Sequence, residues 1–196
     1  MTKSFVHLHA HTEYSMLDGA AKIVDYLKKV KELNQPAAAI TDHGNLYGAM
    51  EFVQKANDLG IKPIIGYEAY ITPGSRFDRP DRENNKRYHL TLLAENNIGY
   101  QNLVELVSKA YTEGYYYKPR IDYELLEQHH DGLIALSGCL GGELAQHLAP
   151  DGSVEEGNTS NERSFEKALE VAKKYQSIFG KNNYFIEIHN HGIKRQ

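Results

Sequence analysis

The chain has 196 residues, a formal net charge of −4 at pH 7 and a single cysteine. This length suits one well-filled core, so we expect a single domain, and one cysteine excludes an internal disulfide framework. The net charge excludes binding of nucleic acid by overall positive charge, and the absence of a long apolar run and of a signal-peptide pattern predicts a cytoplasmic protein without membrane contact.

Strand-like and helix-like patterns alternate along the chain. Short apolar runs read as buried strands at 4–9, 36–41, 62–71, 88–94, 132–137 and 183–188. Apolar residues recur at helical spacing between several of them, within 23–33, 50–56, 103–107 and 165–172. This order predicts an α/β domain with a mostly parallel sheet.

Two polar segments, 72–87 and 150–164, read as loops. The first contains several basic side chains that form either a rim for phosphate groups or an ordinary solvated loop. These side chains are Arg76, Arg79, Arg82, Lys86 and Arg87.

The first predicted strand carries histidines at alternate positions, His7, His9 and His11. Side chains at i and i+2 of a strand share a face, so we expect these imidazoles to point the same way. Hydrogen bonding of one histidine at a strand end is the simpler explanation, but the repetition favours ligands for zinc, manganese or iron. Asp18 follows a short turn later, and Gly19 permits a reversal that returns this carboxylate to the same ion.

Later strands add further side chains that bind metals. The second predicted strand leads directly into Asp42 and His43, and Cys139 follows the fifth. Glu68 lies inside the third, where an ionised carboxylate is costly unless it is paired or bound to a metal. Because chemistry gathers at the carboxyl ends of parallel strands, we expect these groups to converge. An inert buried thiol is the alternative for Cys139.

Several longer segments carry a family resemblance. They are HLHAHTEYSMLDGA, ITDHGNLYGAMEF, GIKPIIGYEAYITPGSRF, YHLTLLAENNIGYQNL and GYYYKPRID. Together they resemble the PHP (polymerase and histidinol phosphatase) domains at the N-terminus of bacterial DNA polymerase III alpha subunits, and the similarity runs through almost the whole chain. The resemblance implies a distorted (β/α)7 TIM-like barrel that holds up to three divalent ions, Zn²⁺ or Mn²⁺, where the strands end.

The resemblance also implies which residues hold these ions. Glu68 is expected to bridge two ions, while His7 and Asp42 are expected to orient ligands from just outside. His89 stands at the start of its predicted strand, where the rule of strand ends does not favour it, so only the resemblance supports it. The implied ligands are His9, His11, Asp18, His43, Glu68, His89 and Cys139.

The resemblance further implies an Asp-x-His pair that the chain lacks before Gln196. We therefore expect residues 1–196 to form one PHP domain, without its last strand, from a larger polymerase subunit. Glu187, His189 and His191 follow the last predicted strand, but this stretch resembles the family segment before the missing pair. The expectation is that these residues do not replace it.

By this resemblance, the expected activity is metal-dependent 3′-5′ exonuclease cleavage during DNA replication, with a metal-bound water as nucleophile and no catalytic side chain identified. The expected partners are a DNA primer 3′ end, the rest of the polymerase subunit and replisome components. Two alternatives remain: a silent structural module that stabilises the polymerase or docks a proofreading subunit, and a stand-alone phosphatase for small phosphate esters. The run 115–117 contains three tyrosines that either stack on bases or pack beside the barrel.

Overall fold

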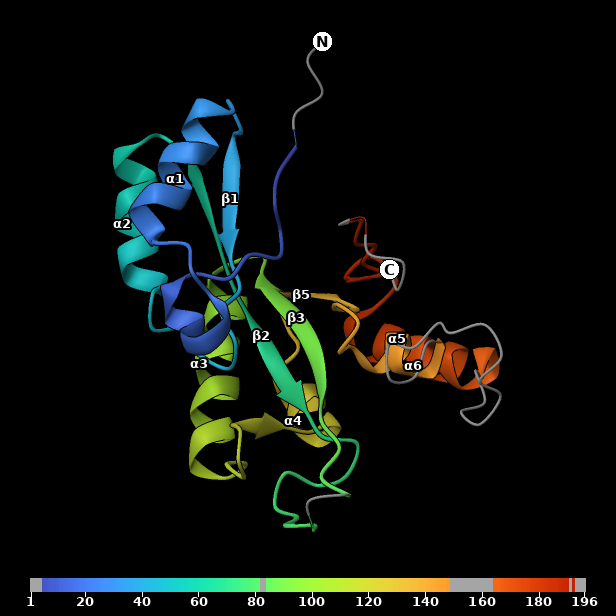
Figure 1. Ribbon diagram of the computed structural model, residues 1–196. Coiled ribbons are helices and arrows are strands. Elements are labelled where there is room, and N and C mark those ends of the chain that lie inside the picture. The colour runs from blue at the N-terminus through green and yellow to red at the C-terminus, as the bar shows by residue number, and fades with distance from the viewer. Residues whose placement is uncertain (1–4, 82–83, 149–163, 191, 193–196) are drawn as a thin grey trace.

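The computed structural model describes residues 5–81, 84–148, 164–190 and 192, which form a mixed α/β fold around one sheet (Figure 1). The elements in chain order are η1 (Glu13–Asp18), α1 (Ile23–Glu32), β1 (Ala37–Ile40), α2 (Ala49–Asp58), β2 (Lys62–Ile71), β3 (Tyr88–Ala94), α3 (Asn97–Thr112), β4 (Arg120–Ile121), α4 (Tyr123–Gln128), β5 (Leu133–Leu136), α5 (Glu143–Leu148), α6 (Phe165–Phe179) and β6 (Tyr184–Phe185).

The six-stranded sheet has the order β1-β2-β3-β5-β6, with β4 paired to β2 beyond the reach of β1. Three pairs are parallel: β1 with β2, β2 with β4, and β5 with β6. Strand β3 is antiparallel to both of its neighbours, β2 and β5. The expected α/β fold is therefore confirmed, but one strand of the sheet runs in the reverse direction.

The first predicted strand is the main difference from the sequence-based expectation. Residues 5–10 are not assigned to a strand. They run beside β1 instead, where Ala39 N–H donates to the carbonyl of His7 and Thr41 N–H donates to the carbonyl of Ala10. These two backbone hydrogen bonds hold the segment next to β1, but they do not form the regular hydrogen-bond ladder of a β-strand. The short strand β4 was not predicted, because two residues give no periodic pattern.

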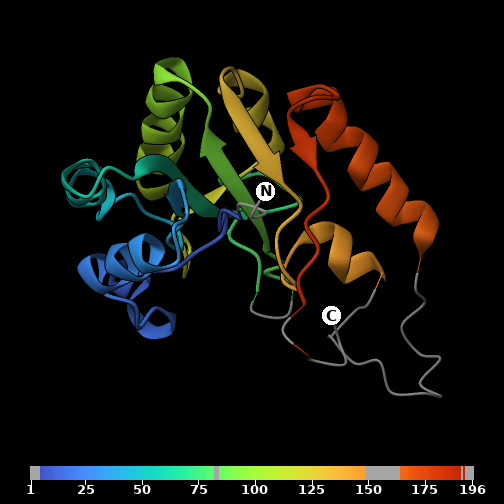
Figure 2. The ribbon, with the colours of Figure 1, turned by 90° about the horizontal axis from the view of Figure 1, so that it is seen from above.

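Helices cover the outer face of the curved sheet (Figures 1 and 2). In α1 the apolar residues Ile23, Leu27 and Val30 recur at helical spacing and pack with Phe52 of α2 and Ile40 of β1. A second, larger cluster joins α3, α4 and α6 to β2, β3 and β5. These two clusters attach the helices to one face of the sheet. Its other face carries the candidate site described below.

The inner face of the sheet has a small apolar cluster of its own. Ala39, Leu93 and Leu136 are buried there, with Ile64 packed against them. Strand β2 alternates, so Tyr67 and its outward neighbours join the large outer cluster, while Ile64 and Glu68 lie on the inner face. Glu68 therefore lies on the same face of the sheet as this apolar cluster, close to the carboxyl end of β2.

Local side-chain caps begin three of the helices. The Asn96 side chain accepts hydrogen bonds from Ile98 N–H and Gly99 N–H at the start of α3. Asp122 and Ser164 cap α4 and α6 in the same manner. These residue types satisfy backbone donors that have no partner within the helix, so the sequence defines these boundaries locally.

The basic loop 72–87 contains no helix or strand in its described residues, as predicted. Arg76 is buried, however, and its guanidinium contacts Glu113 at 2.7 Å, Asp122 at 3.0 Å and Glu124 at 3.2 Å. Neither alternative given for this loop, a phosphate rim or a solvated segment, holds for Arg76, since its side chain is buried and its charge is neutralised by carboxylates. Arg82 and most of the second predicted loop, 150–164, lie outside the described residues.

None of the described helices combines the length and the apolar character needed to cross a bilayer.

Candidate metal centre

Glu68 is the centre of a histidine cluster on the inner face of the sheet. Its carboxylate is fully buried. Oε1 lies 3.4 Å from His9 Nε2 and 3.1 Å from His89 Nδ1, while Oε2 lies 3.1 Å from His11 Nε2 and 2.9 Å from His43 Nδ1. A single carboxylate therefore meets imidazole nitrogens on both of its oxygens.

Separate chain segments bring these side chains together. His9 and His11 come from the segment beside β1, and His43 follows β1 and forms an isolated bridge with Glu68 of β2. His89 stands at the start of β3, where Tyr70 of β2 is its register partner. Because β3 is antiparallel to β2, the start of β3 lies beside the end of β2. The reversed strand explains how His89 reaches a site at the strand ends.

Glu187 and His189, which follow β6, also join the cluster. Glu187 Oε1 lies 2.8 Å from His9 Nδ1 and 2.7 Å from His189 Nε2. The sequence did not place these two residues among the expected ligands, but β6 pairs in parallel with β5 and brings Glu187 beside His9. Alternate spacing of Glu187 and His189 after a strand, the same signal as for His9 and His11, was sufficient to find them. His191 lies outside the described residues.

Asp18 and Cys139 lie at the edge of the cluster. Asp18 Oδ2 is 2.9 Å from His43 Nε2, although the aspartate side chain is 55% exposed. Cys139 Sγ is 3.7 Å from Glu68 Oε1 and 3.6 Å from His89 Nδ1, and it accepts a hydrogen bond from Gly141 N–H. Both residues are therefore placed where they extend the donor set of the histidines.

Gly19 makes the position of Asp18 possible. A Cβ on this glycine would lie 1.7 Å from the carbonyl oxygen of Thr12. Its φ is −115°, which any residue adopts. The glycine is thus needed for close packing of the turn η1 against Thr12, and the reversal expected at this position does not depend on a left-handed backbone.

Asp42 lies beneath the cluster and organises it. This buried carboxylate accepts hydrogen bonds from Thr12 Oγ1 at 2.7 Å and from Ser15 Oγ at 3.0 Å. Because the hydroxyl of Ser15 donates its proton to Asp42, its oxygen accepts a hydrogen bond from Nδ1–H of His11, at 3.1 Å. This tautomer leaves Nε2 of His11, the atom beside Glu68, free to accept a cation.

His7 is placed differently from its neighbours. Its exposed ring packs edge-on against Phe5, with centroids 4.8 Å apart. The alternation expected of a strand fails here because the segment is irregular. The proposed role of His7 in orienting a ligand therefore has no support from its position.

The electrostatics of the cluster are those of an anion among imidazoles. Burial alone would raise the pKa of Glu68, but His11, His43, His89 and His9 outweigh burial and hold that pKa far below its usual range. Burial lowers the pKa of His9, yet hydrogen bonds to Glu187 and Glu68 raise it to about 10.

The same balance applies at the other side of Glu68. Burial lowers the pKa of His89, whereas Cys139 and Glu68 raise it to about 9. Burial raises the pKa of Glu187, and the nearby His9 and His189 lower it overall. The two carboxylates therefore favour positive charge on His9 and His89, and the histidines favour negative charge on Glu68 and Glu187.

Several groups of donor atoms converge closely enough to share one ion. His9–His11–Glu68, His43–Glu68–His89 and His9–Glu187–His189 each place their donor atoms within 4.8 Å of one another. His43 Nδ1 and Glu68 Oε2 are buried and lack a hydrogen bond, although they are 2.9 Å apart. Close, unbonded donors fit a divalent cation better than a hydrogen-bonded network, since buried polar atoms otherwise find partners.

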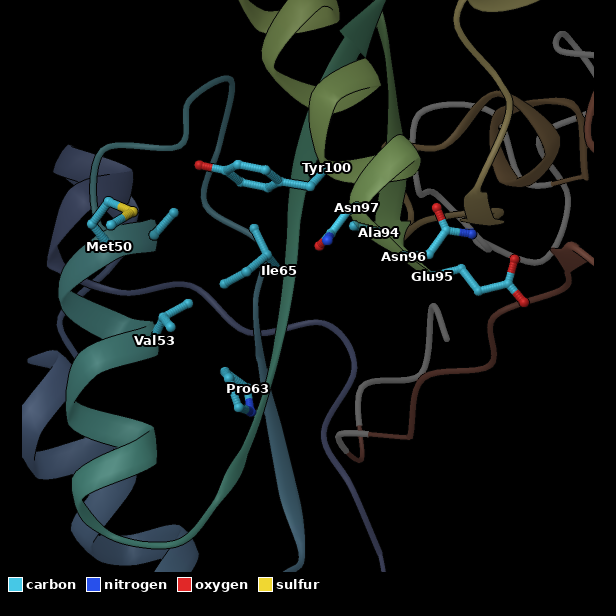
Figure 3. A pocket seen from close by; sticks show the side chains of 10 residues that line it. Met50, Val53, Pro63, Ile65, Ala94, Glu95, Asn96, Asn97 and Tyr100 are labelled. Carbon is cyan, nitrogen blue, oxygen red and sulfur yellow. The ribbon is translucent and has the colours of Figure 1, made fainter.

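A hollow of about 220 Å³ opens beside the cluster. Cys139, Glu187 and His189 line it on the side of the cluster, while Leu140 and Leu144 provide an apolar wall. A larger hollow of about 330 Å³ lies on the outer face, between α2 and the start of α3 (Figure 3). Glu95 is the only carboxylate among the described residues that line the larger hollow, and no histidine or cysteine is among them. The candidate metal ligands therefore lie on the inner face.

Comparison with known proteins identifies the family. The model of the PHP domain matches residues 7–191. The chain belongs to the PHP domain family. This PHP domain is 52% identical over 196 residues to a DNA polymerase III subunit alpha of Thermus aquaticus, and 50% identical over 202 residues to that of Deinococcus radiodurans.

The alignments cover 98% and 99% of this PHP domain but only 15% and 14% of those subunits, so the chain spans about a seventh of these relatives. Among solved structures, a putative metal-dependent phosphoesterase from Bifidobacterium adolescentis is 16% identical, with a TM-score of 0.41 over 55% of this chain and 33% of that one. This weak likeness adds nothing to the family assignment.

Proposed function

We propose that this chain is the PHP domain of a bacterial replicative DNA polymerase III alpha subunit, and that it is a metal-dependent phosphodiesterase with 3′-5′ exonuclease activity. Residues 1–196 would form one domain of the longer polymerase, acting in the cytoplasm. The similarity to alpha subunits over nearly the whole chain supports the first statement. The donor groups that meet at Glu68 and His9 support the second.

The proposed ligands extend over the whole cluster. Glu68 would bridge two ions, because it belongs both to the group with His9 and His11 and to the group with His43 and His89. Glu187 and His189 would provide a third position together with His9. The full set is His9, His11, Asp18, His43, Glu68, His89, Cys139, Glu187 and His189. Imidazole, carboxylate and thiolate ligands suit Zn²⁺, and the set without the thiolate also suits Mn²⁺.

Bound divalent ions would act as Lewis acids and would make hydroxide available at neutral pH. The chain itself would hold the ligands in their metal-binding form. Ser15 and Asp42 fix the tautomer of His11, as described above, and Thr91 Oγ1 lies 3.3 Å from His9 Nδ1. The apolar cluster on the same face as Glu68 would lower the local dielectric constant and so strengthen the electrostatic interactions of the site.

The test uses a labelled DNA primer with a mismatched 3′ end, incubated with the purified chain and Mn²⁺ or Zn²⁺. We expect products shortened one nucleotide at a time from the 3′ end, and no products in excess chelator. His9→Ala should lower the rate by roughly 100-fold or more, because it removes a ligand shared by two groups. His130→Ala is the matched control, since this histidine lies on the surface and bonds the carbonyl of Glu127.

Each alternative predicts a different outcome. Absence of cleavage with every metal, despite metal binding, would favour a structural module that supports the polymerase or docks a proofreading subunit. Faster hydrolysis of nucleotide monophosphates or other small phosphate esters than of the primer would favour a stand-alone phosphatase of the histidinol-phosphatase type. Either result would overturn the exonuclease proposal without affecting the family assignment.

A further inference from the structure

A group of tyrosines lies next to the histidine cluster, on the side of His43 and His89. The ring of Tyr70 stacks on His43 with centroids 5.7 Å apart and meets His89 edge-on at 5.3 Å. Tyr70 itself is almost fully buried. It forms the wall between the cluster and a surface on which other tyrosines are exposed.

The exposed tyrosines come from two different parts of the chain. Tyr47 lies in the loop after His43, and Tyr111 lies in the last turn of α3. Their hydroxyl oxygens are 3.3 Å apart, and the ring of Tyr111 stacks on that of Tyr115 with centroids 6.0 Å apart. The three side chains are 57%, 37% and 54% exposed in the order of their numbers. We call Tyr47, Tyr111 and Tyr115 the tyrosine patch.

The loop that carries Tyr47 is held in place. Gly44 has φ of +66°, and a Cβ there would lie 3.0 Å from Pro119 Cγ and 3.1 Å from Tyr70 Cε2. This glycine therefore lets the loop turn directly onto Tyr70. The buried Asn45 side chain donates to the carbonyls of Tyr14 and His43, and it accepts from Tyr47 N–H. The backbone of Tyr47 is thus held in place before any ligand arrives, which lowers the entropic cost of binding at this residue.

Positive charge lies beside Tyr70. Lys118 Nζ stands 5.2 Å from the centre of the Tyr70 ring, and the Lys118 side chain is exposed. Tyr116, in contrast, is engaged in packing, since its hydroxyl donates to the carbonyl of Pro80 and its ring lies under Arg79. Only part of the tyrosine run near residue 116 is therefore available to a ligand.

We infer that the tyrosine patch binds single-stranded nucleic acid by stacking its bases, and thereby guides a 3′ end toward the ions. This inference rests on the proposed function, because it names how the substrate of that site is held. Exposed aromatic rings with a nearby cation are the features used for sequence-tolerant binding of single strands, since every base has a face to stack. A chain with net charge −4 needs such uncharged contacts to hold a polyanion.

The test measures binding separately from cleavage. A fluorescent single strand of about ten nucleotides, within the usual span of single-strand sites, is titrated with the chain in chelator at fixed low salt. Tyr111→Ala and Tyr47→Ala should each weaken binding by roughly 5-fold to 100-fold, which corresponds to the loss of one stacked base. Tyr111→Phe keeps the ring and should bind within about 2-fold of the wild-type chain. Phe165→Ala, which removes an exposed ring on α6, is the matched control.

A strand with an abasic site distinguishes stacking from charge. The wild-type chain should bind the abasic strand more weakly than the intact one, and the Tyr47→Ala/Tyr111→Ala/Tyr115→Ala variant should not distinguish them. Absence of measurable binding, or binding by this variant equal to wild type, would overturn the inference and leave the patch as a surface for protein. If the wild-type chain does not cleave the primer but these differences in binding are observed, the proposed exonuclease function is refuted and the inference about the tyrosine patch is not.

Discussion

At the scale of single residues, His9 connects two parts of the site. Its two ring nitrogens face different carboxylates, Glu187 at 2.8 Å and Glu68 at 3.4 Å. It is therefore shared by two of the groups that converge on a possible ion. One substitution there should affect two metal positions at once.

We predict that His9→Ala lowers the content of bound Zn²⁺ or Mn²⁺ and weakens the remaining affinity by roughly 100-fold or more, above the range seen when only an outer partner of a ligand is removed. Elemental analysis of the purified protein and titration with metal would measure both effects. His7→Ala is the control, because this exposed ring packs against Phe5, and its metal content should equal that of the wild type. Equal metal content in all three proteins would argue against the ligand assignment.

Arg76 has a similar central position in the loop before β3, but its role is structural. It joins Asp122 at the start of α4 to Glu113 after α3. We predict that Arg76→Leu lowers the free energy of unfolding by about 2 kcal/mol, because Asp122 loses a buried partner but keeps its helix-capping hydrogen bond. Urea denaturation of the two proteins would measure the difference. A loss below about 0.5 kcal/mol would mean that water replaces the guanidinium at no cost.

The same residue predicts a dependence on pH. The hydrogen bond from Arg76 holds the pKa of Glu113 below its ordinary value of 4.5, and Lys109 adds to this effect. A lowered pKa in the folded state gives stability that is present above the unfolded pKa and is lost as the pH falls through the folded value. The stability difference between wild type and Arg76→Leu should therefore be smaller at pH 3 than at pH 7. A difference that stays constant or grows on acidification would contradict this prediction.

At the scale of elements, the sequence predicted most strands and helices but not the direction of β3. Apolar runs are equally apolar in either direction, so a periodic pattern contains no signal for strand polarity. His89 therefore looked misplaced until the sheet showed that β3 starts where β2 ends. The prediction of a strand at 4–9 was also wrong. His7 and His9 alternate in sequence as in a strand, but the backbone of residues 5–10 is irregular.

Helix α3 depends on a close approach that the pattern of apolar residues did not reveal. A Cβ on Gly99 would lie 1.8 Å from the carbonyl oxygen of Gly132, just before β5. We predict that Gly99→Ala destabilises the fold by about 2 kcal/mol, since the helix has to move away from the backbone of the sheet. Gly74→Ala is the control, because its nearest neighbour is the tip of the Asp78 side chain at 3.0 Å. Thermal unfolding that ranks the two variants equally would contradict this account.

At the scale of the whole molecule, the donor residues extend from His9 to His189, and bound ions would join both ends of the sheet. A ligand that binds only the folded state stabilises it, by about 2.7 kcal/mol at a free concentration 100 times its dissociation constant. For a chain of this length we predict that saturating Zn²⁺ or Mn²⁺ raises the Tm by roughly 5 to 10 °C and that chelator reverses the change. Calorimetry of wild type and His9→Ala, in which the increase should shrink, would measure it.

The positions of residues at strand ends pointed to His9, His11 and His43, whereas His89 was expected from the family resemblance alone. All four histidines lie near Glu68. Glu187 and His189 were not among the expected ligands, since the position of the last strand relative to the first depends on the whole sheet and on no single segment. Long-range neighbours of this kind are the part of a fold that local patterns do not contain.

The contact between His9 and Glu187 also has a consequence for the order of events during synthesis. These residues are 178 positions apart in sequence, so the first has left the ribosome long before the second is translated. His43, Glu68 and His89 are available much earlier and form a complete donor group without the carboxyl-terminal part. A nascent chain would therefore be able to bind one ion at His43, Glu68 and His89 while it is still being translated. The position formed by His9, Glu187 and His189 would form only after residue 189 is translated.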